Sequence, residues 1–183
     1  MRQLDPMHSS ARQGGGVRRY HTWPVHRQQT VAEHSWNVAR IVSTIWPEAP
    51  ANVLLYCLFH DVGEIATGDI PFPVKAENPE LKTVLDRLEG EAVDAMGLPP
   101  HPINSLWRGR VKVCDIIEMW EFGTDEELLG NVMAQPITNR TFDKMKELME
   151  ALSKDDVDKI WCYIRLHLHW RQTMELRAGG TTR

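Results

Sequence analysis

The segment LFHDVGEIATGDIPFP, residues 58–73, places ionisable side chains inside and directly after an apolar stretch. His60 and Asp61 are adjacent, Glu64 follows Asp61 by three residues, and Asp69 lies in the proline-containing part of the segment. Burying a charge is costly unless the charge is paired or bound to a metal ion. The segment therefore indicates either a solvated stretch of helix or a group of side chains that holds a ligand.

The sequence on both sides of this segment is typical of helices. Thr30 followed by Glu33 fits a capping box at the start of a helix over residues 31–46, which Pro47 would end. Apolar spacing and end signals predict further helices over residues 51–66, 79–96 and 103–122 and from 155 onward, and two less clear helical stretches within 125–152. No segment shows sustained strand alternation. We therefore predict an all-α fold, a single-domain multi-helix bundle.

The predicted helix over residues 79–96 begins at Asn78-Pro79, an N-cap residue followed by a proline in the first turn. Helical spacing of its apolar residues predicts that one face is buried, made of Leu81, Val84, Leu85, Leu88 and Ala92.

The bulk properties are those of an ordinary globular chain. The 183 residues suit one domain, and a net charge of −4 argues against broad binding to nucleic-acid polymers, which needs excess Lys and Arg. No apolar run approaches a membrane span, so we expect no membrane partner and a cytoplasmic location, the host cytoplasm if the chain is phage-encoded. We expect a flexible leader over 1–17, the domain over 18–177 and a frayed tail over 178–183. Cys57, Cys114 and Cys162 are expected to be buried, reduced thiols.

Four residues on separate parts of the predicted helices are candidate ligands for a divalent ion: His34, His60, Asp61 and Asp115. Imidazole and carboxylate groups together suit Zn, Co, Mn or Fe. Adjacent helical residues point about 100° apart, so one ion would need a crevice between several helices to reach this set. Taken singly, His34 also fits a hydrogen-bonded core histidine, and Asp115 also fits a solvated or capping carboxylate.

Several motifs, in this order, resemble the HD-domain metal-dependent phosphohydrolases. The sequence contains EHS at 33–35, HD at 60–61, ExxTGDxPxPxK at 64–75 and the isolated Asp115. Within that class it is most similar to the short 5'-deoxynucleotidase branch and to the bacteriophage dATP triphosphohydrolases. The resemblance covers roughly residues 18 to 120.

The resemblance implies a role for each matching residue. His34, His60, Asp61 and Asp115 would bind a divalent metal ion, whether Co, Zn, Mn or Mg. Glu64 would be the general acid/base or would orient the attacking water, and Asp69 would lie beside the reacting phosphate or hold a second metal ion. Lys75 would contact phosphate oxygens, and Arg19, Tyr20 and Thr22 would line the nucleotide pocket. A metal-activated water then suffices for hydrolysis, without a Ser or Cys nucleophile.

The segment RRYHTWPVHRQQT, residues 18–30, combines arginines with aromatic residues, which suits phosphate contacts and stacking on a base or sugar. It also fits a basic surface loop with aromatic side chains packed under it. The deoxynucleotidases usually have Arg-Trp-Pro here, whereas this chain has Arg-Tyr-His-Thr, which is closer to the phage enzymes. Arg18, Arg19, Arg27, Lys75 and Lys82 are candidate partners for a triphosphate.

Three functions are compatible with the sequence. The resemblance favours hydrolysis of dATP to deoxyadenosine and triphosphate, with a deoxynucleoside 5'-monophosphatase as the alternative enzyme. A nucleotide-sensing HD module without turnover is the non-enzymatic alternative, and Glu64 and Asp69 beside a complete ligand set argue against it. Relatives that form dimers or hexamers imply that the protein is a homo-oligomer.

Overall fold

The fold is all-α in the part of the chain that a computed structural model describes, residues 10–179. The elements are, in chain order, α1 (Ala11–Gly15), α2 (Val31–Ile45), α3 (Ala51–Phe59), the 3-10 helix η2 (Val62–Ala66), α4 (Phe72–Glu77), α5 (Pro79–Ala95), α6 (Ser105–Leu128), the 3-10 helix η3 (Val132–Ala134), α7 (Gln135–Met149) and α8 (Lys154–Gly179). The described residues contain no strand, only an isolated antiparallel bridge between Arg18 and Thr30. The predicted fold class is confirmed. None of the described helices is long and apolar enough to cross a membrane.

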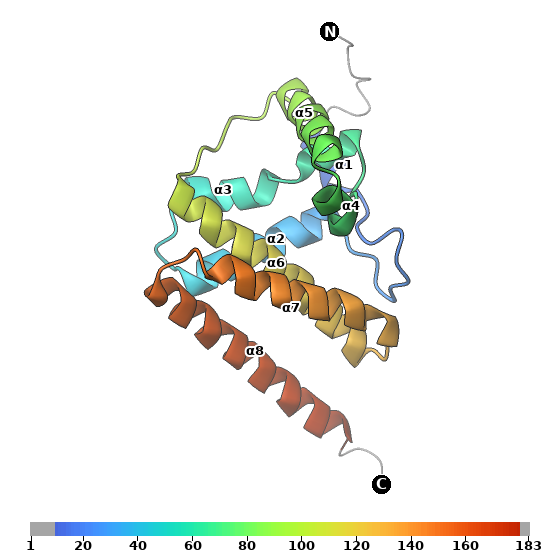
Figure 1. Cartoon of the computed structure of the whole chain (residues 1–183), viewed down its shortest axis with the longest axis vertical. Helices are drawn as coiled ribbons and strands as arrows, with labels where there is room; N and C mark the ends of the chain where they lie inside the picture. The colour runs from blue at the N-terminus through green and yellow to red at the C-terminus, as the bar shows by residue number, and fades with distance from the viewer. Residues whose placement is uncertain (1–9, 180–183) are drawn as a thin grey trace.

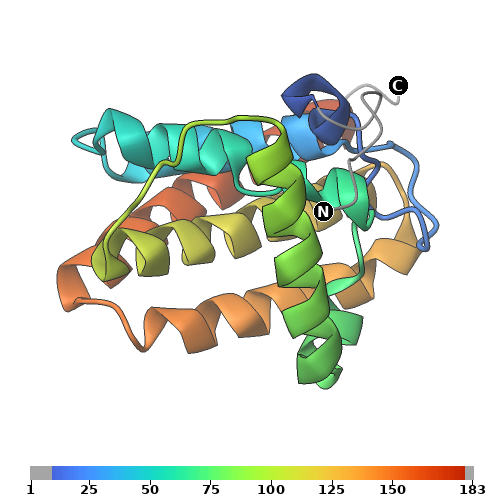
Figure 2. The same cartoon turned by 90° about the horizontal axis from the view of Figure 1, so that it is seen from above.

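The long helix α6 occupies the centre of the bundle. Figure 1 shows α7 alongside α6, α8 extending beyond both of them, and α5 with α4 at the opposite end of the molecule. Viewed from above, α5 crosses the direction of α6 (Figure 2). The apolar core lies between α2, α3, α6, α7 and α8, with α7 packed on α6 and both α3 and α8 on α2, and it includes Ile41, Trp46, Ile117, Met145 and Ile160, all fully buried.

The helix predicted over residues 51–66 is broken at the HD pair. α3 ends at Phe59, Asp61 has φ −108° and ψ 4°, and the chain continues from Val62 as a 3-10 helix. The prediction of one continuous α-helix is therefore wrong at these residues. At this break, His60 Nε2 and Asp61 Oδ2 lie 3.4 Å apart, so both side chains reach the same point.

The expected flexible leader does not extend through residues 10–17. Ser10 caps α1 by accepting a hydrogen bond from the Gln13 N–H, and α1 packs against η2. A Cβ atom at Gly14 would lie 2.4 Å from the Val62 carbonyl oxygen, so only glycine permits this approach. The remaining part of the expected leader, residues 1–9, and most of the expected tail, residues 180–183, lie outside the described residues.

Two burial predictions are wrong in part. On α5, Leu85 and Ala92 are buried, but Leu81 and Val84 are exposed because the first turns of α5 lie at the edge of the molecule, beyond the central core. Cys57 and Cys114 are buried free thiols, as expected, whereas Cys162 is exposed on α8.

A buried carboxylate joins the beginning of α8 to α6 and to the end of α2. Asp156 accepts hydrogen bonds from the Ser153 hydroxyl at 2.8 Å and from Trp46 Nε1 at 2.9 Å, and it pairs with Arg110 at 2.8 Å. Burial alone would raise the pKa of Asp156, but the hydrogen bonds from Ser153, Arg110 and Trp46 outweigh burial and hold the pKa below its ordinary value.

We expect Asp156→Asn to lower the free energy of unfolding by about 3 kcal/mol at neutral pH, because it leaves Arg110 without its buried partner. Since the pKa of Asp156 is lower in the folded than in the unfolded chain, its stabilisation is complete above about pH 4 and is lost as the pH falls through the folded value. Urea unfolding at pH 7 and pH 3 measures both effects. Asp155→Asn, on an exposed neighbour paired with Lys159, is the control, and an equal loss in both variants would contradict the assignment.

Candidate metal centre

Three helical segments bring the four predicted metal ligands together. His34 comes from α2, His60 and Asp61 from the break after α3, and Asp115 from α6. His34 Nε2 lies 3.1 Å from Asp115 Oδ1 and 3.6 Å from Asp61 Oδ2, and His60 Nε2 lies 3.4 Å from the same Asp61 oxygen. His34, His60 and Asp61 each offer a ligand atom within 4.8 Å of the others. The residues that the sequence singled out as ligands therefore converge.

The hydrogen bonds behind the imidazole rings fix which nitrogen of each ring faces the cluster. His60 Nδ1 contacts the Cys57 carbonyl oxygen at 2.7 Å, so this nitrogen carries the proton and donates it. His34 Nδ1 is hydrogen-bonded to the carboxylate of Glu118. In metal sites a ligating His typically bonds a carboxylate or carbonyl through its other nitrogen. The inward Nε2 atoms of both rings are buried and make no well-aligned hydrogen bond, and His34 Nε2 faces the carboxylate of Asp115 at 3.1 Å, which fits a divalent cation between them.

Glu118, which sequence reasoning missed, contacts Nδ1 of the predicted metal ligand His34. It lies one helical turn after Asp115 on α6, it is buried, and it also accepts a hydrogen bond from Gln29 Nε2 at 2.6 Å. Its i+3 spacing from Asp115 was the available signal, since residues at this spacing share a helix face.

The electrostatics of the cluster favour positive charge at its centre. Burial and the nearby Arg19 would lower the pKa of His34, but Glu118 and Asp115 outweigh them and raise it to about 9. Burial would raise the pKa of Asp61, yet His60, His34 and Arg19 lower it below the ordinary value. The carboxylates of the cluster stay ionised, and their negative charge stabilises positive charge beside the imidazole rings. A cation site requires both properties.

Glu64 lies beside the cluster, on η2. It is almost completely buried, its Oε1 pairs with Lys75 Nζ at 3.2 Å, and its Oε2 has no hydrogen-bond partner. Burial, followed by the negative charges of Asp61 and Asp69, raises the pKa of Glu64 to about 8 against the opposing effect of Lys75. The group can therefore exchange a proton near neutral pH.

The predicted nucleotide-binding residues are brought to the cluster in part. Arg19 Nη1 lies 3.3 Å from Asp61 Oδ2, and the Tyr20 N–H donates to Asp69 Oδ2 at 3.3 Å. Tyr20 has φ 54°, the only positive φ of a non-glycine residue in the described chain, and its ring stacks on Phe122 at 4.4 Å. Backbone strain of this kind is common at functional sites. Thr22 is exposed, and no contact links it to the cluster.

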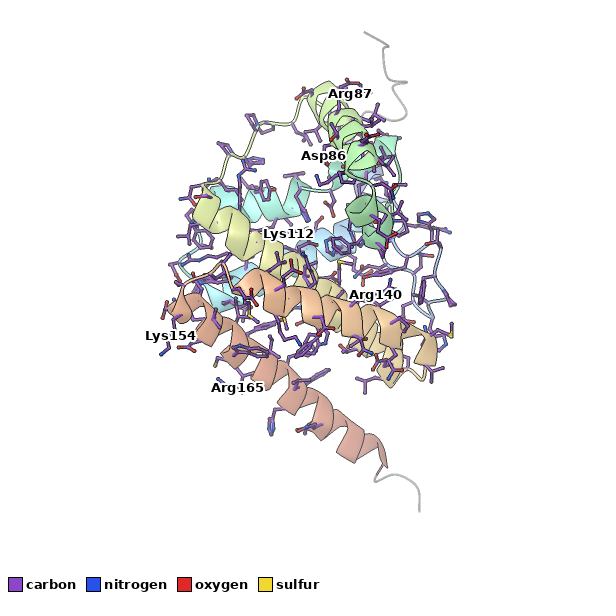
Figure 3. The ribbon with its side chains drawn as sticks, in the orientation of Figure 1. Asp86, Arg87, Lys112, Arg140, Lys154 and Arg165 are labelled. Carbon is purple, nitrogen blue, oxygen red and sulfur yellow. The ribbon has the colours of Figure 1, made fainter. Side chains whose placement is uncertain are left out.

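The cations near the cluster are only in part those expected: Arg19 and Lys75 pair with carboxylates of the site, and Lys112 was not predicted. Lys112 lies one turn before Asp115 on α6, and its Nζ pairs with the Asp115 carboxylate at 2.7 Å. Burial raises the pKa of the Tyr56 hydroxyl, and the positive charges of Arg108 and Lys112 oppose this rise. Figure 3 labels Lys112 on α6, and its side chain is exposed. Arg27 pairs instead with Asp125 and Glu126, and Lys82 with Asp86 on exposed α5. Arg18 forms the bridge with Thr30.

Comparisons with known proteins agree with this arrangement. The family described as 5'-deoxynucleotidase YfbR-like matches residues 15–108. A dATP triphosphohydrolase of Salmonella phage PMBT28 is 33% identical over 56% of this chain and 58% of its own length. A 5'-deoxynucleotidase of Vibrio parahaemolyticus is 32% identical over 38% of this chain and 42% of its own length. The chain therefore matches only about half the length of these curated relatives.

A solved structure, the Cyanophage S-2L HD phosphohydrolase DatZ bound to dA and one catalytic Zn²⁺ ion, has the same fold. It superposes with a TM-score of 0.71 at 21% identity and covers 90% of this chain and 96% of that one. The helical bundle thus has the fold of an HD phosphohydrolase. The chain belongs to the YfbR-like 5'-deoxynucleotidase family within that class, as the motifs predicted.

Proposed function

We propose that this protein hydrolyses the bond between the α-phosphorus and the 5' oxygen of a deoxynucleotide, with dATP as substrate and deoxyadenosine and triphosphate as products. The observation that carries this proposal is the convergence of His34, His60, Asp61 and Asp115 on one point beside Glu64. The water oxygen joins phosphorus, and the 5' oxygen leaves with a proton. Relatives named dATP triphosphohydrolase and 5'-deoxynucleotidase support the reaction class.

The four ligand residues would hold one divalent cation, of which Zn, Co, Mn and Mg are the candidates. Such a cation, when bound, supplies an acidified water and polarises the phosphoryl oxygen. Glu118 and the Cys57 carbonyl hold the two imidazole rings so that their Nε2 atoms face inward. Glu64 holds or releases a proton at Oε2, which is buried and has no partner. Asp69 accepts the Tyr20 backbone N–H and would hold this residue beside the reacting phosphate.

The choice of a triphosphate is supported by the cations that surround the cluster. Arg19, Lys75 and Lys112 each pair with a carboxylate of the site, namely Asp61, Glu64 and Asp115. A triphosphate carries several negative charges. During hydrolysis, further negative charge develops on the leaving group and on the phosphoryl oxygens, and nearby cations neutralise it. The dATP triphosphohydrolase of the Salmonella phage aligns with 56% of this chain, which supports dATP.

A deoxynucleoside 5'-monophosphatase is the second candidate, because the matching family is described as 5'-deoxynucleotidase. The test is incubation of the protein with each dNTP and dNMP in the presence of Zn, Co, Mn or Mg, followed by chromatography of the products. Triphosphate and deoxyadenosine from dATP would support the first candidate. Orthophosphate from dNMPs would support the second, and the absence of product from every nucleotide would reject both.

We expect Lys112→Ala to raise KM for dATP about tenfold and to change KM for dAMP much less, because one charge-assisted contact to the phosphate tail is lost. Steady-state kinetics with both nucleotides measure the difference. Lys146→Ala, which removes an exposed cation from α7, is the matched control. Equal effects of Lys112→Ala on dATP and dAMP would place Lys112 outside the contacts to the triphosphate tail.

A further inference from the structure

Residues 19–29, here called the nucleotide loop, form a closed loop whose two ends meet. The Arg19 N–H donates to the Gln29 carbonyl at 2.9 Å, and the Val31 N–H donates to the Val17 carbonyl at 2.9 Å. Arg18 and Thr30 form the bridge between these two bonds. The ends of the nucleotide loop are thus fixed at the start of α2, a few residues before His34, and its tip must be held by other contacts.

The tip is held by the far end of α6. Glu126, fully buried, accepts the His26 N–H at 2.6 Å and the Arg27 N–H at 3.0 Å. Asn131 donates to Glu126 and to the Pro24 carbonyl, both at 2.9 Å, and Trp23 Nε1 donates to the Met133 carbonyl at 2.9 Å. Burial would raise the pKa of Glu126, but the hydrogen bonds from Asn131, His26 and Arg27 lower it, so the group is an ionised acceptor.

One face of α6 contacts the nucleotide loop at three points. Glu118, Phe122 and Glu126 follow one another at intervals of four residues, which places them in a row along the helix. Glu118 accepts Gln29 at the base of the loop, Phe122 stacks on Tyr20, and Glu126 binds the tip. The same helix carries Asp115 of the metal centre. A single rigid element therefore relates the position of the loop to the position of the cluster.

We propose that Glu126 is a positioning residue for substrate recognition: it anchors the tip of the nucleotide loop on α6, so that Arg19 and Tyr20 are held beside the metal centre. Its carboxylate contacts no residue of the cluster, and it lies beyond the part of the chain that the family match covers, residues 15–108. The proposal rests on the proposed function, since it assigns nucleotide recognition to this loop. It predicts that Glu126 determines nucleotide affinity and not the chemical step.

The test is Glu126→Gln, which replaces one carboxylate oxygen by an NH₂ group. This NH₂ group cannot accept the backbone N–H groups of His26 and Arg27. We expect the affinity for deoxyadenosine, measured by calorimetry, to fall about tenfold or more, since hydrogen bonds to a charged group are lost. KM for dATP should rise in parallel while kcat changes less than about twofold. The content of bound divalent metal should be unchanged, and hydrogen exchange at the amides of His26 and Arg27 should become faster.

Trp23→Phe is the second variant, for the case that Glu126→Gln does not fold. It removes only the exposed hydrogen bond to the Met133 carbonyl and should weaken deoxyadenosine binding in the same direction, by a smaller factor. Glu147→Gln, an exposed carboxylate on α7 with 64% of its side chain accessible, is the matched control.

Faster exchange in the loop without weaker nucleotide binding would overturn the proposal, and so would a fall in kcat and in bound metal without a change in the loop. Deoxyadenosine affinity and amide hydrogen exchange are both measured without turnover. They can therefore be interpreted even if the protein hydrolyses no nucleotide. Failure of the proposed function is thereby separated from failure of the anchor.

Discussion

Asp61→Ala is expected to abolish hydrolysis, with a loss of at least about 10³-fold, or roughly 4 kcal/mol of transition-state stabilisation. The Asp61 Oδ2 atom lies within 3.6 Å of His34 Nε2 and 3.4 Å of His60 Nε2. Removing it takes away the carboxylate shared by both imidazole groups. The bound metal, measured by elemental analysis, should fall with the activity, while helical circular dichroism should stay largely intact because α2, α3 and α6 pack through the apolar core.

Asp61 also pairs with Arg19, which is buried, so the alanine variant is expected to lose some stability as well. Asp61→Asn keeps the shape of the side chain and separates the loss of charge from the loss of packing. Asp86→Asn, an exposed carboxylate on α5, is the control. Turnover that survives in both Asp61 variants would reject the metal-binding role.

Glu64→Gln is expected to keep the metal and lose most of the rate, by about 10²- to 10⁴-fold, the usual range for a general acid or base. The side chain keeps its size and its contact with Lys75, but it no longer exchanges a proton. Burial and the charges of Asp61 and Asp69 raise the pKa of Glu64 to about 8 in the metal-free protein, and a bound cation lowers this pKa. Since glutamine does not titrate, the pH profile of kcat should lose one ionisation in the variant.

Glu91→Gln, on the exposed side of α5, is the control for that measurement. If Glu64→Gln lost the metal together with the rate, Glu64 would belong among the metal ligands. If it kept the rate, the proton would be transferred by another group.

Much of the fold was predictable because local signals agreed with the tertiary arrangement. Thr30 does cap α2, by accepting the Glu33 N–H, and Asn104 caps α6 in the same manner. The break at His60 and Asp61 was not predictable, because the apolar pattern continues through it. The break and the cluster coincide, since the chain leaves the α-helix at the two residues whose side chains meet in the cluster.

The candidate site was predictable where it rests on motifs and not where it rests on contacts between distant segments. His34, His60, Asp61 and Asp115 converge as the HD pattern implied, although their metal-binding role stays a prediction. Glu118 escaped notice because a carboxylate inside a helix is ordinarily solvated. The anchoring of His26 by Glu126 joins residues 100 positions apart, and only the three-dimensional structure brings such residues together.

The backbone at the HD break is enclosed on two sides. Gly14 of α1 approaches the Val62 carbonyl so closely that a Cβ atom would lie 2.4 Å from it, and a Cβ atom at Gly63 would lie 2.6 Å from the Glu89 carbonyl of α5. The corner that aims His60 and Asp61 is therefore held by main chain against main chain, with no side chain between that could yield. Neither glycine offers a group to metal or nucleotide, yet an alanine at either position would force two stretches of main chain apart and so move the corner that carries His60 and Asp61.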